Sequence, residues 1–125
     1  MRSDGFRAAA EAKDFAAGEH LFAPDVTFRS PVVYKSYEGR EALKLLLGAV
    51  VQVFEDFRYV EQVETGNTAV LQFEARVGEK SLQGVDILKF DDEGAITELT
   101  VMVRPMSGVH ALAEAMQRML ESASA

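Results

Sequence analysis

The spacing of apolar residues changes near residue 55, from a helical repeat to alternation of apolar and polar positions. Before this point, apolar stripes predict a helix over Phe6–Ala17, a short helical piece over Glu19–Ala23 and a long apolar helix over Arg40–Phe54. After it, four runs predict strands joined by short turns, and such connections make neighbouring strands antiparallel. A last amphipathic helix is expected after Ser107, which can cap it. Helices, then an antiparallel meander, then a helix predict an α+β fold.

The linking segments of the first half are also predicted. Val26–Arg29 alternates as a short strand, and Pro31 directly after it argues against pairing in the centre of a sheet. Tyr34–Glu38 is expected to be a loop, and Gly39 opens the long helix that follows. At the other end of the chain, Glu121–Ala125 is expected to be a frayed tail.

Composition limits what such a fold can do. The 125 residues suit one domain, 1–125, and the 48% that are hydrophobic can build its core. Cysteine is absent, which excludes disulfides and a thiol nucleophile. The net charge of -7 disfavours nucleic acid and anionic membrane surfaces as partners. The longest uncharged stretch, Leu45–Phe54, is about half of the roughly 20 residues that cross a membrane. We therefore expect a soluble, cytoplasmic protein.

Short strings along nearly the whole chain carry a family resemblance. They are Leu21-Phe22-Ala23-Pro24-Asp25, Ser30-Pro31-Val32, Gly39-Arg40-Glu41-Ala42, Gly84-Val85-Asp86 and Asp92-Glu93-Gly94-Ala95-Ile96-Thr97-Glu98. With the order of elements, they make the sequence similar to the SnoaL-like branch of the nuclear transport factor 2-like superfamily. The resemblance implies a curved antiparallel sheet wrapped around the N-terminal helices, leaving a conical apolar pocket. Ketosteroid isomerases, polyketide cyclases and limonene-epoxide hydrolases share this fold, so function must be argued from the site.

Asp86 is the leading candidate for a functional residue. It has the parity of Leu88 and Phe90 in the run Leu82–Phe90, so it is expected to face the interior of the sheet. Burial disfavours the ionised carboxyl and raises its pKa above the usual value of about 3.9. A neutral acid can donate a hydrogen bond to a substrate oxygen, and an ionised one can accept a proton. In the alternative reading, strand twist brings Asp86 to the pocket mouth or to an arginine.

The resemblance to ketosteroid isomerases is partial. The string Val85–Phe90 resembles the isomerase strand whose aspartate is held protonated. The same comparison places the isomerase's oxyanion tyrosine, its catalytic base and a supporting tyrosine at Phe6, Ser30 and Leu47. Three of the four polar groups are therefore absent, and steroid isomerisation by that mechanism is not expected.

Two other relatives also match only in part. Epoxide hydrolases use arginine, one spacer and aspartate on this strand, whereas Gly84-Val85-Asp86 keeps the acid and lacks the arginine. Cyclases rely on an acid of the last strand. Here that acid is Glu98, and it is expected to face outward, so the cyclase base is not assigned to it.

The remaining pocket residues are predicted from parity. Besides Asp86, the pocket is expected to be lined by Phe6, Phe28, Leu47, Phe54, Tyr59, Phe73, Leu88, Leu99 and Val101. Tyr34 and Tyr37, at the expected mouth, either offer a phenol to a ligand or pack as ordinary aromatics, and Tyr34 is a second candidate catalytic residue. His20 and His110 are expected at the surface. Neither a metal motif nor a phosphate-binding loop is present, so no metal and no cofactor are predicted.

Two functions follow from these residues. The first is a pocket protein that binds a small hydrophobic molecule, with cofactor-free acid-base chemistry of isomerase, cyclase or hydratase type through Asp86. The second is a non-catalytic dimeric module for ligand binding or protein interaction. A void containing Asp86 and a tyrosine or histidine within hydrogen-bond reach favours the first. Apolar residues of the opposite sheet face predict a homodimer through that face, and they are Val70, Val85, Ile87 and Met102.

Overall fold

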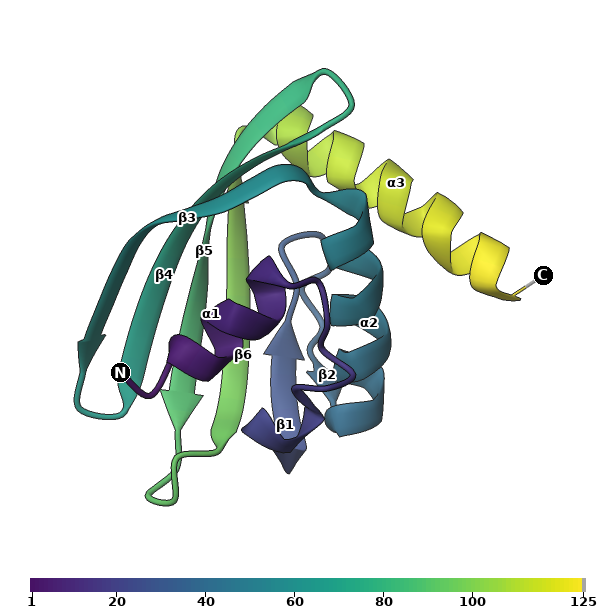
Figure 1. Ribbon diagram of the computed structural model, residues 1–125. Helices are drawn as coiled ribbons and strands as arrows, with labels where there is room; N and C mark the ends of the chain where they lie inside the picture. The colour runs from purple at the N-terminus through teal and green to yellow at the C-terminus, as the bar shows by residue number, and fades with distance from the viewer. Residues whose placement is uncertain (125) are drawn as a thin grey trace.

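A computed structural model describes residues 1–124 as three helices packed on one curved, unclosed sheet (Figure 1). In chain order the elements are α1 (Asp4–Glu11), the short 3-10 helix η1 (Glu19–Leu21), β1 (Phe22–Arg29), β2 (Tyr37–Glu38), α2 (Arg40–Val53), β3 (Glu55–Thr65), β4 (Thr68–Val77), β5 (Lys80–Phe90), β6 (Ile96–Arg104) and α3 (Met106–Ser124). The predicted α+β class with a curved sheet is confirmed.

The sheet has the order β2-β1-β6-β5-β4-β3. The four long strands form the predicted antiparallel meander, in which Asp86 lies opposite Leu71 of β4 and Val101 of β6. The β1–β6 pair is parallel, a pairing that the sequence analysis did not anticipate. Its register is irregular between Phe22 and Thr27, where Pro24 has no N–H to donate to a ladder.

Helix boundaries differ from expectation at both ends of the chain. α1 stops at Glu11 rather than at Ala17, and Lys13 adopts a positive φ of 56° just beyond it. The following turns bury Phe15, whose ring lies 5.3 Å from that of Phe6. α2 ends one residue before its predicted end. α3 continues through Ser124, so the expected tail is helical up to that residue, and Ala125 lies outside the described residues.

The prediction for the loop after β1 is wrong in part. Tyr37 and Glu38 form the short strand β2, which pairs antiparallel with β1, instead of belonging to the loop. Gly39 follows with a φ of 97°, a conformation that favours glycine, and α2 begins at the next residue. β1 itself is longer than predicted and begins at Phe22, and the predicted helical piece before it is reduced to η1.

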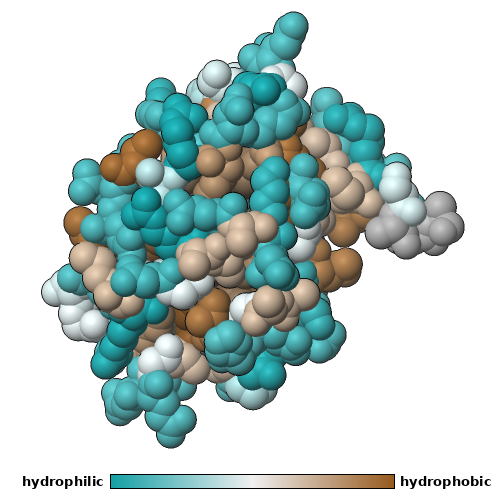
Figure 2. Space-filling view, viewed as in Figure 1, coloured by the Kyte–Doolittle hydropathy of each residue, from teal (hydrophilic) through white to brown (hydrophobic). Residues whose placement is uncertain are grey.

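The two faces of the sheet differ in burial. On β4 the residues alternate between buried and half-buried, as the sequence pattern predicts, and Leu71 is fully buried. α1 and α2 lie together on one side of the sheet (Figure 1). From this side, apolar groups show in hollows between hydrophilic side chains (Figure 2).

Of the helices described, none combines the length and apolar character needed to cross a membrane.

Candidate functional site

A cavity of about 400 Å³ lies between the helices and the inner face of the sheet. All three α-helices and all six strands contribute to it, and its lining is mostly aliphatic and aromatic. Among the lining residues that the structure describes, Asp86 is the single charged side chain, and Lys, Arg and His are absent. The volume falls within the range of about 300 to 1,000 Å³ typical of ligand pockets.

Most of the residues predicted from parity surround this cavity. They are Phe6, Phe28, Leu47, Phe54, Tyr59, Phe73, Asp86 and Val101. Leu88 and Leu99 do not line it, although both are fully buried. These two face each other across β5 and β6, two residues further toward the turn at residues 91–95, where the core is closed. Residues with the same inward parity therefore line the cavity at one end of the strands and pack in closed core at the other end.

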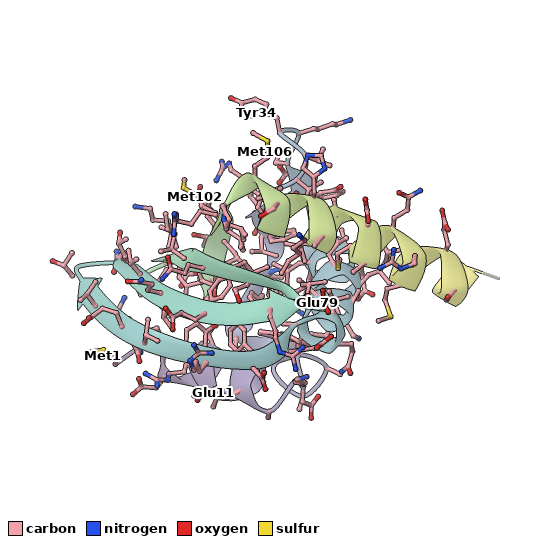
Figure 3. The ribbon with its side chains drawn as sticks, turned by 90° about the horizontal axis from the view of Figure 1, so that it is seen from above. Met1, Glu11, Tyr34, Glu79, Met102 and Met106 are labelled. Atoms are coloured by element: carbon pink, nitrogen blue, oxygen red, sulfur yellow. The ribbon has the colours of Figure 1, made fainter. Side chains whose placement is uncertain are left out.

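The expectation that Tyr34 offers a phenol at the pocket mouth is wrong. Its side chain is fully exposed and points away from the molecule (Figure 3). The first part of the loop at residues 30–36 contributes to the cavity lining through Val32 and Val33, whereas Tyr34 does not line it. Tyr37 follows the packed alternative, because it lines the cavity with its ring stacked at 6.1 Å from that of Phe28.

Asp86 and Tyr59 form the polar centre of the cavity. The Tyr59 hydroxyl donates a hydrogen bond to Oδ2 of Asp86, with 2.7 Å between the oxygens, and both side chains are buried. Tyr59 belongs to β3 and Asp86 to β5, so the phenol reaches across β4. Among the described residues, Tyr59 is the one hydrogen-bond partner of this carboxyl group.

The environment of this pair shifts both pKa values upward. Burial raises the pKa of Asp86 to about 7, and the hydrogen bond from Tyr59 opposes part of that rise. The rise agrees in direction with the sequence prediction. Burial, followed by the neighbouring Asp86 charge, raises the pKa of Tyr59, which therefore keeps its proton and remains a donor. Near neutral pH the carboxyl exists in both forms, so it can give or take a proton.

Two further features shape the site around the pair. Arg7 of α1 places its guanidinium carbon 5.6 Å from the centre of the Tyr59 ring, and its Nη1 donates to Gln62 Oε1 at 2.9 Å. Gly84 lies opposite Phe73, and a Cβ at Gly84 would overlap the Phe73 ring. The missing side chain therefore lets this ring come close to the backbone of β5, two residues before Asp86.

The polar groups that the isomerase comparison looked for are absent. Phe6 and Leu47 line the cavity as apolar side chains. The Ser30 hydroxyl accepts hydrogen bonds from the backbone N–H groups of Val32 and Val33, so it holds the loop at the rim. Glu98 pairs with Arg29 at 2.6 Å, half-exposed, outside the cavity lining as predicted.

Histidines and potential metal ligands add nothing to the site within residues 1–124. His20 and His110 are exposed, as expected. No group of three or more potential metal ligands comes together within this part of the chain.

The pairing of Tyr59 with Asp86 was missed at the sequence level, although both residues were assigned to the interior. Alternation along a strand places each side chain on the inner face, but it does not fix the register of β3 relative to β5. β3 has two register irregularities, on either side of Arg58–Tyr59, and these decide where the phenol lies. The sequence contained one signal for this pairing: Tyr59 and Asp86 are polar side chains with inward parity on strands of the same meander.

Three helices packed on a curved, unclosed six-stranded sheet place the chain in the cystatin-like class of α+β folds. Residues 4–99 match the family model of the SnoaL-like domain, and the chain belongs to this family. The comparison with curated proteins gave no match.

Solved structures are similar over almost the whole chain. A steroid delta-isomerase from Pseudomonas aeruginosa is 42% identical, with a TM-score of 0.93 over 97% of this chain and 90% of that one. An uncharacterized protein with a cystatin-like fold from Silicibacter pomeroyi is 33% identical, with a TM-score of 0.90 over 94% and 83%. A nuclear transport factor 2-like protein from Cytophaga hutchinsonii, at 22% identity and a TM-score of 0.67 over 86% and 93%, shares the fold.

Proposed function

We propose that this protein binds a small, mostly hydrophobic organic molecule in the cavity and acts on it by cofactor-free acid-base chemistry through Asp86. The observation that carries this proposal is the 2.7 Å hydrogen bond between Tyr59 and Asp86 inside a cavity of about 400 Å³. A non-catalytic module with a filled core needs no empty cavity. It also needs no buried carboxyl group, whose desolvation costs free energy. The arrangement therefore favours a working pocket over a purely structural module.

The chemistry proposed is a proton shift within one ligand. Oδ2 of Asp86 is engaged by Tyr59, so Oδ1 is the oxygen available to a ligand. As a carboxylate, Asp86 takes a proton from a ligand carbon whose C–H bond is acidic. As an acid, it returns the proton to another atom of the same molecule. A single carboxyl can perform both steps, and the described lining holds no second carboxyl group and no histidine. Isomerisation thus fits the site better than hydration, which needs a second group to position water.

The similarity to the steroid delta-isomerase adds support to an isomerase-type activity. This chain cannot use the constellation of ketosteroid isomerases, because Phe6 and Ser30 replace two of its polar groups. Any isomerisation here depends on Asp86 and Tyr59 instead.

The test is turnover of β,γ-unsaturated cyclic ketones, followed by the ultraviolet absorbance of the conjugated product. Exchange of ligand protons in D₂O, followed by NMR, detects the first step alone. We expect Asp86→Asn to retain ligand binding and lose both signals, because an amide cannot carry the proton. Asp92→Asn, on the exposed turn between β5 and β6, is the matched control and should retain them. Exchange that persists in Asp86→Asn would contradict the proposed role.

We also propose a homodimer that associates through the outer face of the sheet. Met102 is 55% exposed and Val63 53% exposed, and Val70 lies directly opposite Val63. Met102 projects away from the side on which α1 lies (Figure 3). Apolar side chains gathered on an exposed face are typical of an interface. If the protein dimerises but binds no ligand, the second hypothesis, a non-catalytic interaction module, takes precedence.

A further inference from the structure

The geometry points to a cationic ligand: we propose that the cavity takes a small hydrophobic amine, whose ammonium group pairs with Oδ1 of the Asp86 carboxylate beside the aromatic cluster of Phe54, Phe57, Tyr59 and Phe73. This inference rests on the binding part of the proposed function, since it names a ligand class of the same cavity. An ammonium group at Oδ1 occupies the oxygen that the proton shift needs, so the amine is a bound ligand and not the substrate of that shift.

The charge of the lining restricts the ligand first. Asp86 is the single charged side chain among the described lining residues, and no basic side chain is present there. An anionic ligand would lie beside a buried acid without any cation to compensate it, which costs several kcal/mol for each uncompensated ion. The ligand is therefore neutral or positively charged.

When Asp86 is ionised, its hydrogen bonding favours a positively charged ligand over a neutral one. Tyr59 donates to Oδ2, and a donated hydrogen bond stabilises the ionised form of a carboxyl. This is the one hydrogen bond that Asp86 receives from the described residues. Buried carboxylates are otherwise compensated by several donors or by an opposite charge. An ammonium group at Oδ1 would supply both a donor and the missing charge.

The aromatic cluster provides a second attraction for a cation. Phe57 lies at its centre, with ring centroids 4.9 Å from Tyr59, 5.1 Å from Phe73 and 5.6 Å from Phe54. Aromatic rings carry negative charge on their faces, so a ring face that borders the cavity attracts a cation. The Tyr59 ring already has the Arg7 guanidinium near it, from a position outside the cavity lining. These rings and the carboxyl line one cavity, so one ligand can contact both.

The charged groups near the pair are few, which makes the pH dependence of binding interpretable. On the neighbouring strands, Leu71 of β4 and Val101 of β6 lie opposite Asp86, and neither side chain titrates. α1 contributes Arg7 and Glu11, whose ion pair spans 3.5 Å and acts on Tyr59 from outside the lining. Between pH 6 and pH 8 the ionised fraction of Asp86 rises from about one tenth to about nine tenths, given its pKa of about 7.

The experiment compares three probes of matched size by calorimetry at pH 6 and pH 8: 4-phenylbutylamine, 4-phenylbutan-1-ol and 4-phenylbutanoate. At pH 8 we expect the amine to bind about tenfold more tightly than the alcohol, and the carboxylate probe not to bind. The affinity for the amine should rise by roughly ninefold from pH 6 to pH 8, in proportion to the ionised fraction of Asp86. The affinity for the alcohol should not rise over this range.

Two variants separate the Asp86 charge from the general acidity of the chain. Asp86→Asn should abolish the preference for the amine and keep the affinity for the alcohol within about threefold, because the cavity retains its shape. Asp92→Asn removes one exposed negative charge and should leave the preference intact. In the wild-type protein, carboxyl NMR supplies an independent measurement, since the bound amine should lower the pKa of Asp86 and the bound alcohol should not.

The outcomes distinguish this inference from the proposed function. Alcohol binding as tight as amine binding at pH 8, or an amine preference that survives in Asp86→Asn, overturns the cationic ligand and leaves a pocket for neutral molecules. Failure of both the amine and the alcohol to bind overturns the small-molecule pocket as well.

Discussion

Replacing Asp86 by Asn removes an ionisable group from the cavity while nearly preserving its shape. The amide oxygen can still accept the hydrogen bond from Tyr59, so the main loss is the ability to ionise. The pH dependence of the difference in unfolding free energy between wild type and variant therefore isolates the cost of ionising a buried carboxyl.

The size of this cost follows from the two pKa values. Burial raises the pKa of Asp86 to about 7 in the folded protein, against about 3.9 in the unfolded chain. A difference of about 3 units at 1.36 kcal/mol per unit gives about 4 kcal/mol. Because the folded state holds the proton longer, this contribution is fully present below pH 4. It is lost as the pH rises to about 7, and the variant shows no such loss.

Urea unfolding of wild type and Asp86→Asn at intervals from pH 4 to pH 8 measures the effect. We expect the stability of wild type relative to the variant to fall by about 4 kcal/mol across this range and to level off above pH 7. Asp92→Asn, measured in parallel, controls for the loss of one exposed charge. A difference that stays constant, or that grows with pH, would refute the reasoning. It would mean that Asp86 ionises in the folded protein as readily as in water.

Three further predictions concern the neighbours of Asp86 and the outer face. Tyr59→Phe removes the donor that favours the carboxylate, so carboxyl NMR should report a higher pKa for Asp86, and a fall would contradict the assigned hydrogen bond. Gly84→Ala forces the Phe73 ring to move, and urea unfolding should show a loss of about 1 to 3 kcal/mol, whereas unchanged stability would contradict the close approach. Ile87→Asp places a charge on the proposed dimer face, so sedimentation should show monomers where the wild type is dimeric. A wild-type protein that is already monomeric at micromolar concentration would rule out that dimer.

Local periodicity was sufficient for much of the fold. The alternation on β4 and β5 depends only on the two-residue repeat of an extended backbone, so the inward direction of Asp86 could be assigned without knowing its neighbours. The apolar stripe of α2 predicted the end of that helix to within one residue for the same reason. The direction of the pKa shift of Asp86 also followed, because a carboxyl among apolar residues is desolvated whatever the details of packing.

Local signals failed where long-range packing competes with propensity. The alanine-rich stripe continues to Ala17, yet α1 stops at Glu11, because the turns after it bury Phe15 against Phe6 and Phe22. The gain from burying an aromatic ring exceeds the helix propensity of a few residues.

By itself, then, the sequence determined which residues face inward, the class of the fold and a single acid as the centre of the candidate site. Only the tertiary structure decided that β1 joins β6 in parallel, that Leu88 and Leu99 belong to closed core, and that Tyr34 points to solvent. It also decided the pairing of Asp86 with Tyr59. A side chain's direction is a property of its own backbone, whereas its partner depends on register offsets and bulges summed over three strands, and no local pattern records that sum.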